Sequence, residues 1–169
     1  MKRGTGIALL ALLLVALAFD AKAEESPSLG LGLAWAPIGG QGFSLRKIPY
    51  DQNGYQCGVI FWKGSENGYF NIGAEYLFVL KHTRMTALYV PVGFAFTYDR
   101  YTEYYYGGYG FSDSTDVIED NFFTVGGGVG FMFRSERLEN IWFSFDLVMV
   151  AQKDYIGPIP QVAAHYMFK

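Results

Sequence analysis

The stretch from Asn121 to Arg134, NFFTVGGGVGFMFR, constrains the fold more than any other part of the chain. From Phe123 to Phe133, apolar residues or glycine alternate with small or neutral ones, a period of two that is typical of a β-strand. A strand of a soluble sheet normally turns charged or polar side chains toward water, and between Phe123 and Phe133 this one turns no charge either way. The pattern predicts a strand in the wall of a closed membrane barrel, with bulky residues facing lipid and small ones facing the lumen.

The amino-terminal segment predicts export from the cytoplasm. It begins with two basic residues, continues with an apolar run from Ile7 to Phe19, and reaches the sequence Ala21-Lys22-Ala23. The apolar run is shorter than the roughly 20 residues that a helical membrane anchor, the alternative, needs. We therefore expect residues 1–23 to be a cleaved signal peptide and residues 24–169 to form one barrel domain.

The charge and cysteine content of the mature chain exclude some partners and cross-links. Cleavage after Ala23 leaves ten basic and fifteen acidic residues, a net charge near −5. A chain this acidic is a poor partner for nucleic acid, so we expect none. Cys57 is the only cysteine, so no disulfide can form within the chain.

Seven further segments repeat the alternation, so the expected fold is all-β: an eight-stranded antiparallel up-and-down transmembrane barrel. Most segments approach the roughly 9 to 11 residues that a tilted membrane strand needs. Pro91 predicts a bulge, because proline cannot donate a ladder hydrogen bond, and the facing of residues 55–63 stays open because both of their faces are bulky. The expected strands are residues 29–35, 42–48, 55–63, 69–81, 86–98, 121–134, 140–152 and 158–168.

The connections between these strands differ in length in a way that orients the barrel. Barrels of this type have short periplasmic turns and longer outer loops. With both termini in the periplasm, the one long connection, residues 99–120, falls outside the cell. The other expected outer loops are 37–41, 64–68 and 153–157, and the expected periplasmic turns are 49–54, 82–85 and 135–139.

Charge separates a membrane barrel from a soluble barrel of the lipocalin or avidin kind. A soluble barrel also alternates, but its apolar face points inward and its charged face points to water. A soluble barrel with as few outward charges as this chain would precipitate. We therefore expect the bacterial outer membrane as the location, with its lipid and lipopolysaccharide around the barrel. Charged residues within the expected strands include Arg46, Lys47, Lys63, Glu75, Lys81 and Asp146.

The signal peptide, the eight alternating strands, the short turns and the closing strand QVAAHYMFK resemble the small outer-membrane barrel superfamily of the OmpA transmembrane domain and OmpX. Tyr166 and Phe168 are similar to the C-terminal aromatic signal by which barrel-assembly machinery recognises such proteins, although Lys169 follows the last aromatic residue. The resemblance implies a way of building a barrel and a Gram-negative outer membrane. It does not imply an activity.

Several polar residues fall on the expected lumen face. We expect them to form an internal ionic network that fills the lumen, because buried charges persist only when they are paired. With Gln152 expected near Pro158, Ser144 or Asp146 should lie directly across from His165, within one register step. A hydrolytic triad of Ser144, His165 and Asp146, as in a lipid A-modifying barrel enzyme, is the less favoured alternative. The expected network consists of Arg46, Glu75, Asp146, Gln161 and His165.

The inward glycines at 126, 128 and 130 suggest how tightly the lumen is filled. They are expected to make room for Trp142, Tyr89 or Arg46 on other strands, because the interior of an eight-stranded barrel is just wide enough for side chains to fill it. The alternative is a narrow water path, which would make the protein a small pore.

The long loop, residues 99–120, is the best candidate for a binding role. It carries six acidic residues against one arginine, without the spacing of a calcium-binding EF-hand, so no metal or cofactor is expected. Tyrosine supplies rigid contact area, which favours a non-enzymatic, structural or adhesin-like role toward an extracellular surface or protein, although tyrosines near the strand fit an aromatic girdle equally well. The candidate contact residues are Tyr101, Tyr104, Tyr105, Tyr106 and Tyr109.

Overall fold

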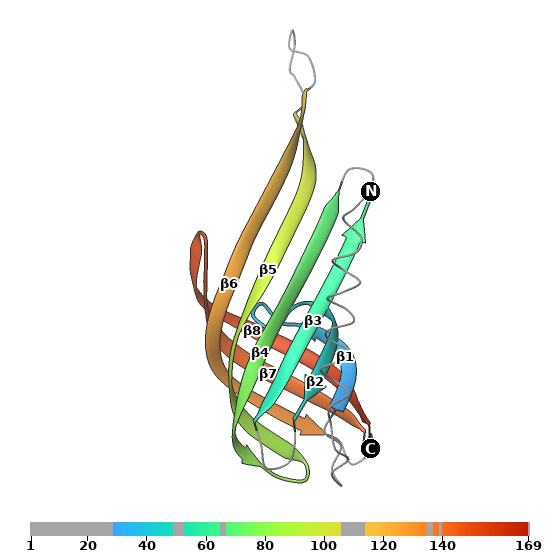
Figure 1. Ribbon diagram of the computed structural model, residues 1–169, viewed down its shortest axis with the longest axis vertical. Coiled ribbons are helices and arrows are strands. Elements are labelled where there is room, and N and C mark those ends of the chain that lie inside the picture. Colours follow the sequence, from blue (N-terminus) through green and yellow to red (C-terminus); the bar gives the residue numbers. More distant parts are fainter. Residues whose placement is uncertain are drawn as a thin grey trace.

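The chain folds into a closed barrel of eight antiparallel strands, which pair in chain order until β1 closes on β8 (Figure 1). The computed structural model describes residues 29–48, 53–64, 67–105, 114–134, 137–138 and 140–168, so the expected signal peptide lies outside the described residues. The up-and-down barrel expected from the sequence is confirmed. No helix in the described residues is long and apolar enough to cross a membrane.

Strand boundaries agree with the sequence prediction for most of the chain, because each strand continues for as long as the period of two does. Three strands are clearly longer than predicted: β5 and β6 at the ends that join them, and β8, which begins at Tyr155 and reduces the outer loop expected at residues 153–157 to a turn of Lys153 and Asp154. The strands are β1 (Leu29–Trp35), β2 (Gly42–Lys47), β3 (Gly54–Lys63), β4 (Gly68–His82), β5 (Thr86–Tyr105), β6 (Ser114–Arg134), β7 (Ile141–Gln152) and β8 (Tyr155–Phe168).

Side chains alternate between the two faces of the barrel wall as predicted. On β7, Phe145, Leu147 and Met149 are exposed on the outside, whereas Ser144 and Asp146 are buried in the lumen. The exposed apolar side chains surround the barrel, and we call them the apolar belt. The belt includes Leu31, Leu33, Trp35, Phe43, Phe61, Phe78, Phe94, Phe131, Phe145, Leu147 and Val162.

The facing of β3, which the sequence left open, follows from its pairing with β4. Gln56 and Gly58 of β3 are buried in the lumen, and their partners Glu75 and Gly73 are buried there too. Phe61 of β3 is 72% exposed and belongs to the apolar belt.

The expected bulge at Pro91 is not present. Pro91 faces Leu77 on β4, and the register between β5 and β6 is the same on both sides of it, so the proline adds no extra residue. The register shift lies instead in β4, between Val79 and Lys81. A bulge leaves one extra residue in one strand, and here it is followed by the short turn into β5.

The prediction that residues 99–120 form a loop is wrong for the described residues 99–105 and 114–120. β5 continues to Tyr105 and β6 begins at Ser114, and these two residues pair with each other. The alternation of the barrel strands continues beyond the wall, and each strand satisfies the backbone hydrogen bonds of the other. Figure 1 shows the two strands rising beyond the rest of the barrel. Residues 106–113, with Tyr106 and Tyr109, lie outside the described residues.

Candidate functional site

Five polar side chains from five strands form a closed ring across the lumen. Arg46 of β2 donates from Nη1 to the Tyr89 hydroxyl of β5 at 3.2 Å, and Tyr89 donates to Asp146 Oδ1 of β7 at 2.5 Å. Gln161 of β8 donates from Nε2 to Asp146 Oδ2 and to Glu75 Oε2 of β4, each at 3.2 Å. The Nη2 atom of Arg46 lies 3.7 Å from Glu75 Oε1, which closes the ring. We call these five side chains the polar ring.

All members of the polar ring are buried, so each depends on the others for its hydrogen bonds. One guanidinium faces two carboxyl groups, and Arg46 also donates from Nε to Gln56 of β3 at 2.5 Å. Removing one member of a buried charged network leaves the remaining charges without partners, which is strongly destabilising. The ring therefore ties five strands of the barrel together through its lumen.

Apolar layers lie on both sides of the polar ring. Along β7, the inward side chains follow the order Trp142, Ser144, Asp146, Val148 and Val150, so the ring lies between Trp142 on one side and the two valines on the other. Trp142 packs in one apolar cluster with Ile48, Leu77, Ala87, Tyr89, Met132 and Met167, and the two valines pack in another with Ile38 and Ile159.

The connection between β1 and β2 folds into the barrel instead of lying outside it. Ile38 is 0% exposed and packs against Val148 and Val150. Its backbone N–H donates to Gln161 Oε1 at 3.3 Å, so the connection is bonded directly to the polar ring. The prediction of an outer loop at residues 37–41 is wrong, because burial in the lumen removes the apolar Ile38 side chain from water. We call residues 36–41 the plug.

Glycines of the barrel wall make the space that the plug occupies. Gly58 of β3 and Gly73 of β4 are cross-strand partners, and a Cβ atom on either would collide with the backbone of Gly40. Gly40 itself has a φ of +83°, a left-handed conformation that favours glycine. The N–H of Gln41 donates to Asn71 Oδ1 at 2.7 Å. Close backbone packing and this hydrogen bond therefore fix the plug in place.

His165 lies in the lumen but outside the polar ring. Its Nε2 atom lies 2.9 Å from Ser44 Oγ of β2. On the neighbouring strand its partner is Trp142, so the prediction that Ser144 or Asp146 faces His165 is wrong.

A tight turn explains that error in register. β7 and β8 are joined by Lys153 and Asp154 alone, and Gln152 pairs with Tyr155 where the sequence-based register paired it with Pro158. Among the described residues, no hydrogen bond joins Ser144, His165 and Asp146 into a catalytic relay.

The structure thus brings four of the five expected lumen residues together and leaves His165 apart. The sequence-based reasoning missed Gln56 and Tyr89 as network members, as well as the plug. The alternation of the sequence places Tyr89 on the lumen face, but no local pattern identifies Asp146 as its hydrogen-bond partner. The inward-facing Gly58 and Gly73 could have indicated the plug, because residues without side chains leave room for another segment in the lumen.

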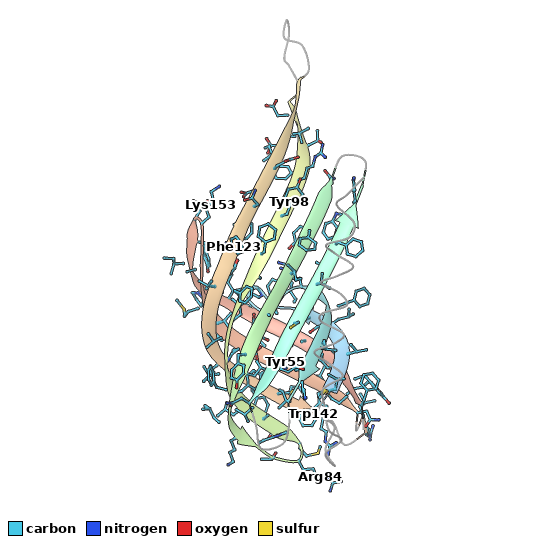
Figure 2. The ribbon with its side chains drawn as sticks, in the orientation of Figure 1. Tyr55, Arg84, Tyr98, Phe123, Trp142 and Lys153 are labelled. Atoms are coloured by element: carbon cyan, nitrogen blue, oxygen red, sulfur yellow. The ribbon has the colours of Figure 1, made fainter. Side chains whose placement is uncertain are left out.

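The last pair between β4 and β5 joins Gly68 with Arg100. Beyond this pair, β5 and β6 pair only with each other among the described strands. These five pairs, residues 101–105 with 114–118, form what we call the ribbon. Tyr101 and Val117 of the ribbon are exposed. In Figure 2, Tyr98 and Phe123 mark the base of the ribbon, and Trp142 and Arg84 lie toward the opposite end of the barrel.

The ribbon and its base carry like charges at paired positions. Glu103 lies directly opposite Asp116, and Asp99 lies opposite Asp120 on the same face. Like charges at such positions destabilise a ladder, so the acidic face is not explained by the stability of the ribbon. No group of three or more metal-ligating side chains in the described part of the chain is placed to hold a metal ion. Two exposed ion pairs, Arg100 with Glu119 and Lys153 with Asp120, have N···O distances of 3.5 Å.

One edge of β6 is open near the ribbon. β6 pairs with β7 only from Val125 to Arg134, so residues 114–124 face no other described strand on that side. Along this edge, every second residue turns its backbone N–H and C=O groups away from β5, and these groups are available to another strand.

The expected assembly signal lies at the end of β8. Tyr166 and Phe168 are exposed on the outer face, and their ring centroids are 5.4 Å apart. Phe96 of β5 and Phe123 of β6 form a second outward aromatic pair, with their ring centroids 5.0 Å apart.

No family profile and no curated protein matches the chain. Two similar solved structures are the N-terminal β-barrel domain of OprF from Pseudomonas aeruginosa and the outer membrane protein Ail from Yersinia pestis in a phospholipid bilayer nanodisc. The OprF domain is 15% identical, with a TM-score of 0.45, over 83% of this chain and 94% of that one. Ail is 14% identical, with a TM-score of 0.38, over 83% of this chain and 97% of that one.

Proposed function

We propose that the protein is a non-enzymatic barrel of the bacterial outer membrane that presents the ribbon at the cell surface for contact with a partner. The observation that carries the placement is the distribution of side chains: the apolar belt faces outward and the polar ring faces inward. Phe43 is 76% exposed and Arg46 of the same strand is 0% exposed. Such an exterior is stable in lipid, where every backbone group of a closed barrel is already paired.

Fractionation of cells tests this placement. The full chain is expected in the outer-membrane fraction, and it should migrate faster on an unheated gel than after heating, because a folded barrel resists detergent. Recovery of the mature chain as a soluble periplasmic protein would overturn the placement.

Three features support a contact role for the ribbon. It extends beyond the pairing of the other strands, its paired residues Glu103 and Asp116 are like charges that destabilise a ladder, and residues 114–124 have an open strand edge. Together they favour a partner with a positively charged surface or an extended basic segment. Tyr101, which is exposed, adds contact area on the same ribbon.

A loop-shortening variant tests this role. Replacing residues 101–118 with Asn-Gly joins the paired residues Arg100 and Glu119 through a two-residue turn and leaves the barrel wall intact. Cells displaying the full chain should adhere to amine-coated beads more than to carboxylate-coated beads, and the shortened variant should lose this difference. A second variant with Glu103→Gln and Asp116→Asn keeps the ribbon but should weaken the adhesion. Equal adhesion of the full chain and the shortened variant would count against the proposal.

A small pore is the second candidate, and the filled lumen disfavours it. The polar ring, the two apolar clusters and the plug occupy the barrel along its length. The purified protein should therefore show no single-channel conductance in planar bilayers, whereas regular conductance steps would favour the pore.

A further inference from the structure

An apolar groove runs along the outer surface of the barrel over β8. It has a volume of about 570 Å³. One side is formed by Leu33 and Trp35 of β1, the other by Phe143 and Phe145 of β7, and Ala164 of β8 lies at its floor. The outward side chains that line it are all apolar.

The groove arises from one small residue between two large ones. Ala164 is the direct cross-strand partner of both Leu33 and Phe143, so its methyl group lies between two bulky side chains of the apolar belt. A concave site of this size in the apolar belt cannot be left empty without losing dispersion contacts. In a bilayer, the material available to fill it is hydrocarbon.

The groove reaches the turn between β6 and β7, because its lining residue Phe133 is one residue from the end of β6. Phe133 and Phe143 are paired, and the turn that follows Phe133 carries the exposed Arg137. Two residues after Ala164 on β8, the hydroxyl of Tyr166 accepts a hydrogen bond from Asn140 Nδ2 at 3.2 Å. An apolar groove next to a turn that carries a cation, with a fixed hydroxyl two residues beyond Ala164, matches an acyl chain whose headgroup carries a phosphate.

We propose that this groove binds one acyl chain of an anionic phospholipid of the periplasmic leaflet, with the phosphate at Arg137. The leaflet follows from position: Phe133, Phe143 and Ala164 lie toward the end of the barrel opposite to the ribbon. The inference rests on the outer-membrane placement proposed above, and it does not depend on the role of the ribbon.

Native mass spectrometry of the full chain, folded in detergent and supplied with phosphatidylglycerol, tests the groove. The wild-type barrel should retain one lipid molecule. Ala164→Leu fills the floor of the groove and should weaken lipid retention by about tenfold or more. A tenfold loss of affinity corresponds to a loss of only about 1.4 kcal/mol in binding free energy. Ala74→Leu is the matched control, since Ala74 also faces outward, on β4, but lies outside the groove. Should Ala164→Leu fail to fold, Ala164→Val replaces it.

A second variant tests the headgroup. Arg137→Gln should reduce the preference for phosphatidylglycerol over phosphatidylethanolamine about fivefold, the effect of one cation near an anionic headgroup. Equal retention by the wild type and Ala164→Leu overturns the groove, and an unchanged preference overturns the role of Arg137. Retention of purified lipopolysaccharide in place of phosphatidylglycerol overturns the leaflet, and a dimer abolished by Ala164→Leu identifies a second copy of the chain as the occupant instead.

These outcomes are separate from a failure of the outer-membrane placement. A wild-type chain that is soluble without detergent refutes the placement itself. A folded barrel whose lipid retention ignores position 164 refutes only the groove.

Discussion

The ring of Tyr89 on β5 lies over Gly130 on β6, its direct cross-strand partner. A Cβ atom at residue 130 would collide with this ring and with the Asp146 carboxylate that Tyr89 contacts. The absence of a side chain at Gly130 therefore leaves room for the hydrogen bond between Tyr89 and Asp146 in the polar ring.

Gly130→Ala should destabilise the barrel by about 1–3 kcal/mol, the usual effect of overpacking a filled interior. Urea unfolding in detergent micelles measures the change. Gly68→Ala is the control, because the nearest atom to its added methyl group would be Trp62 O at 3.9 Å, so this variant should unfold like the wild type. Equal stability of both variants would mean that the Tyr89 ring is free to move aside.

Arg46→Met should cost about 3–5 kcal/mol, because it leaves the Glu75 and Asp146 carboxyl groups buried beside Gln161 without their cation. Adding Glu75→Gln to this variant should restore part of the loss. A double-mutant cycle of unfolding free energies measures the coupling. Simple additivity of the two single changes would contradict the closed ring.

The plug makes a prediction about access to the lumen. A cysteine at residue 38, introduced as Ile38→Cys with Cys57→Ser, should resist a water-soluble maleimide, because Ile38 is fully buried. Adding Gly40→Val should make the thiol reactive, since a side chain there collides with Gly58 and the φ of +83° disfavours valine. A cysteine at the exposed Lys153 serves as the positive control in both backgrounds. A thiol at residue 38 that reacts as fast as the control would show that the plug is open.

His165→Ala should lower the unfolding free energy by about 1–3 kcal/mol, because it leaves the buried Ser44 hydroxyl without a partner. Ser44→Ala should give a similar loss. The lipid A profile of cells that express either variant, measured by mass spectrometry, should match that of cells expressing the wild type. A lipid A modification present with the wild type and lost with His165→Ala would revive the enzymatic alternative.

Much of the barrel was predictable because its main signal is local. The period of two places Phe131 outside and Gly130 inside without any knowledge of the neighbouring strands, and the same reasoning placed Arg46, Glu75, Asp146 and Gln161 in the lumen. It failed where a contact depends on distant residues. The turn between β7 and β8 set a register that moved His165 away from Asp146, and β5 found its continuation in β6 beyond the expected strand end.

By itself, then, the sequence determined that this chain makes a barrel with an apolar exterior, because strand period and facing arise from neighbouring residues along one chain. Only the tertiary structure decided that the lumen is closed. The plug is held by Gly58, Gly73 and Gln161, which come from three different strands, and the polar ring needs five. Such contacts exist only after the barrel has closed and its wall has brought those strands around one axis.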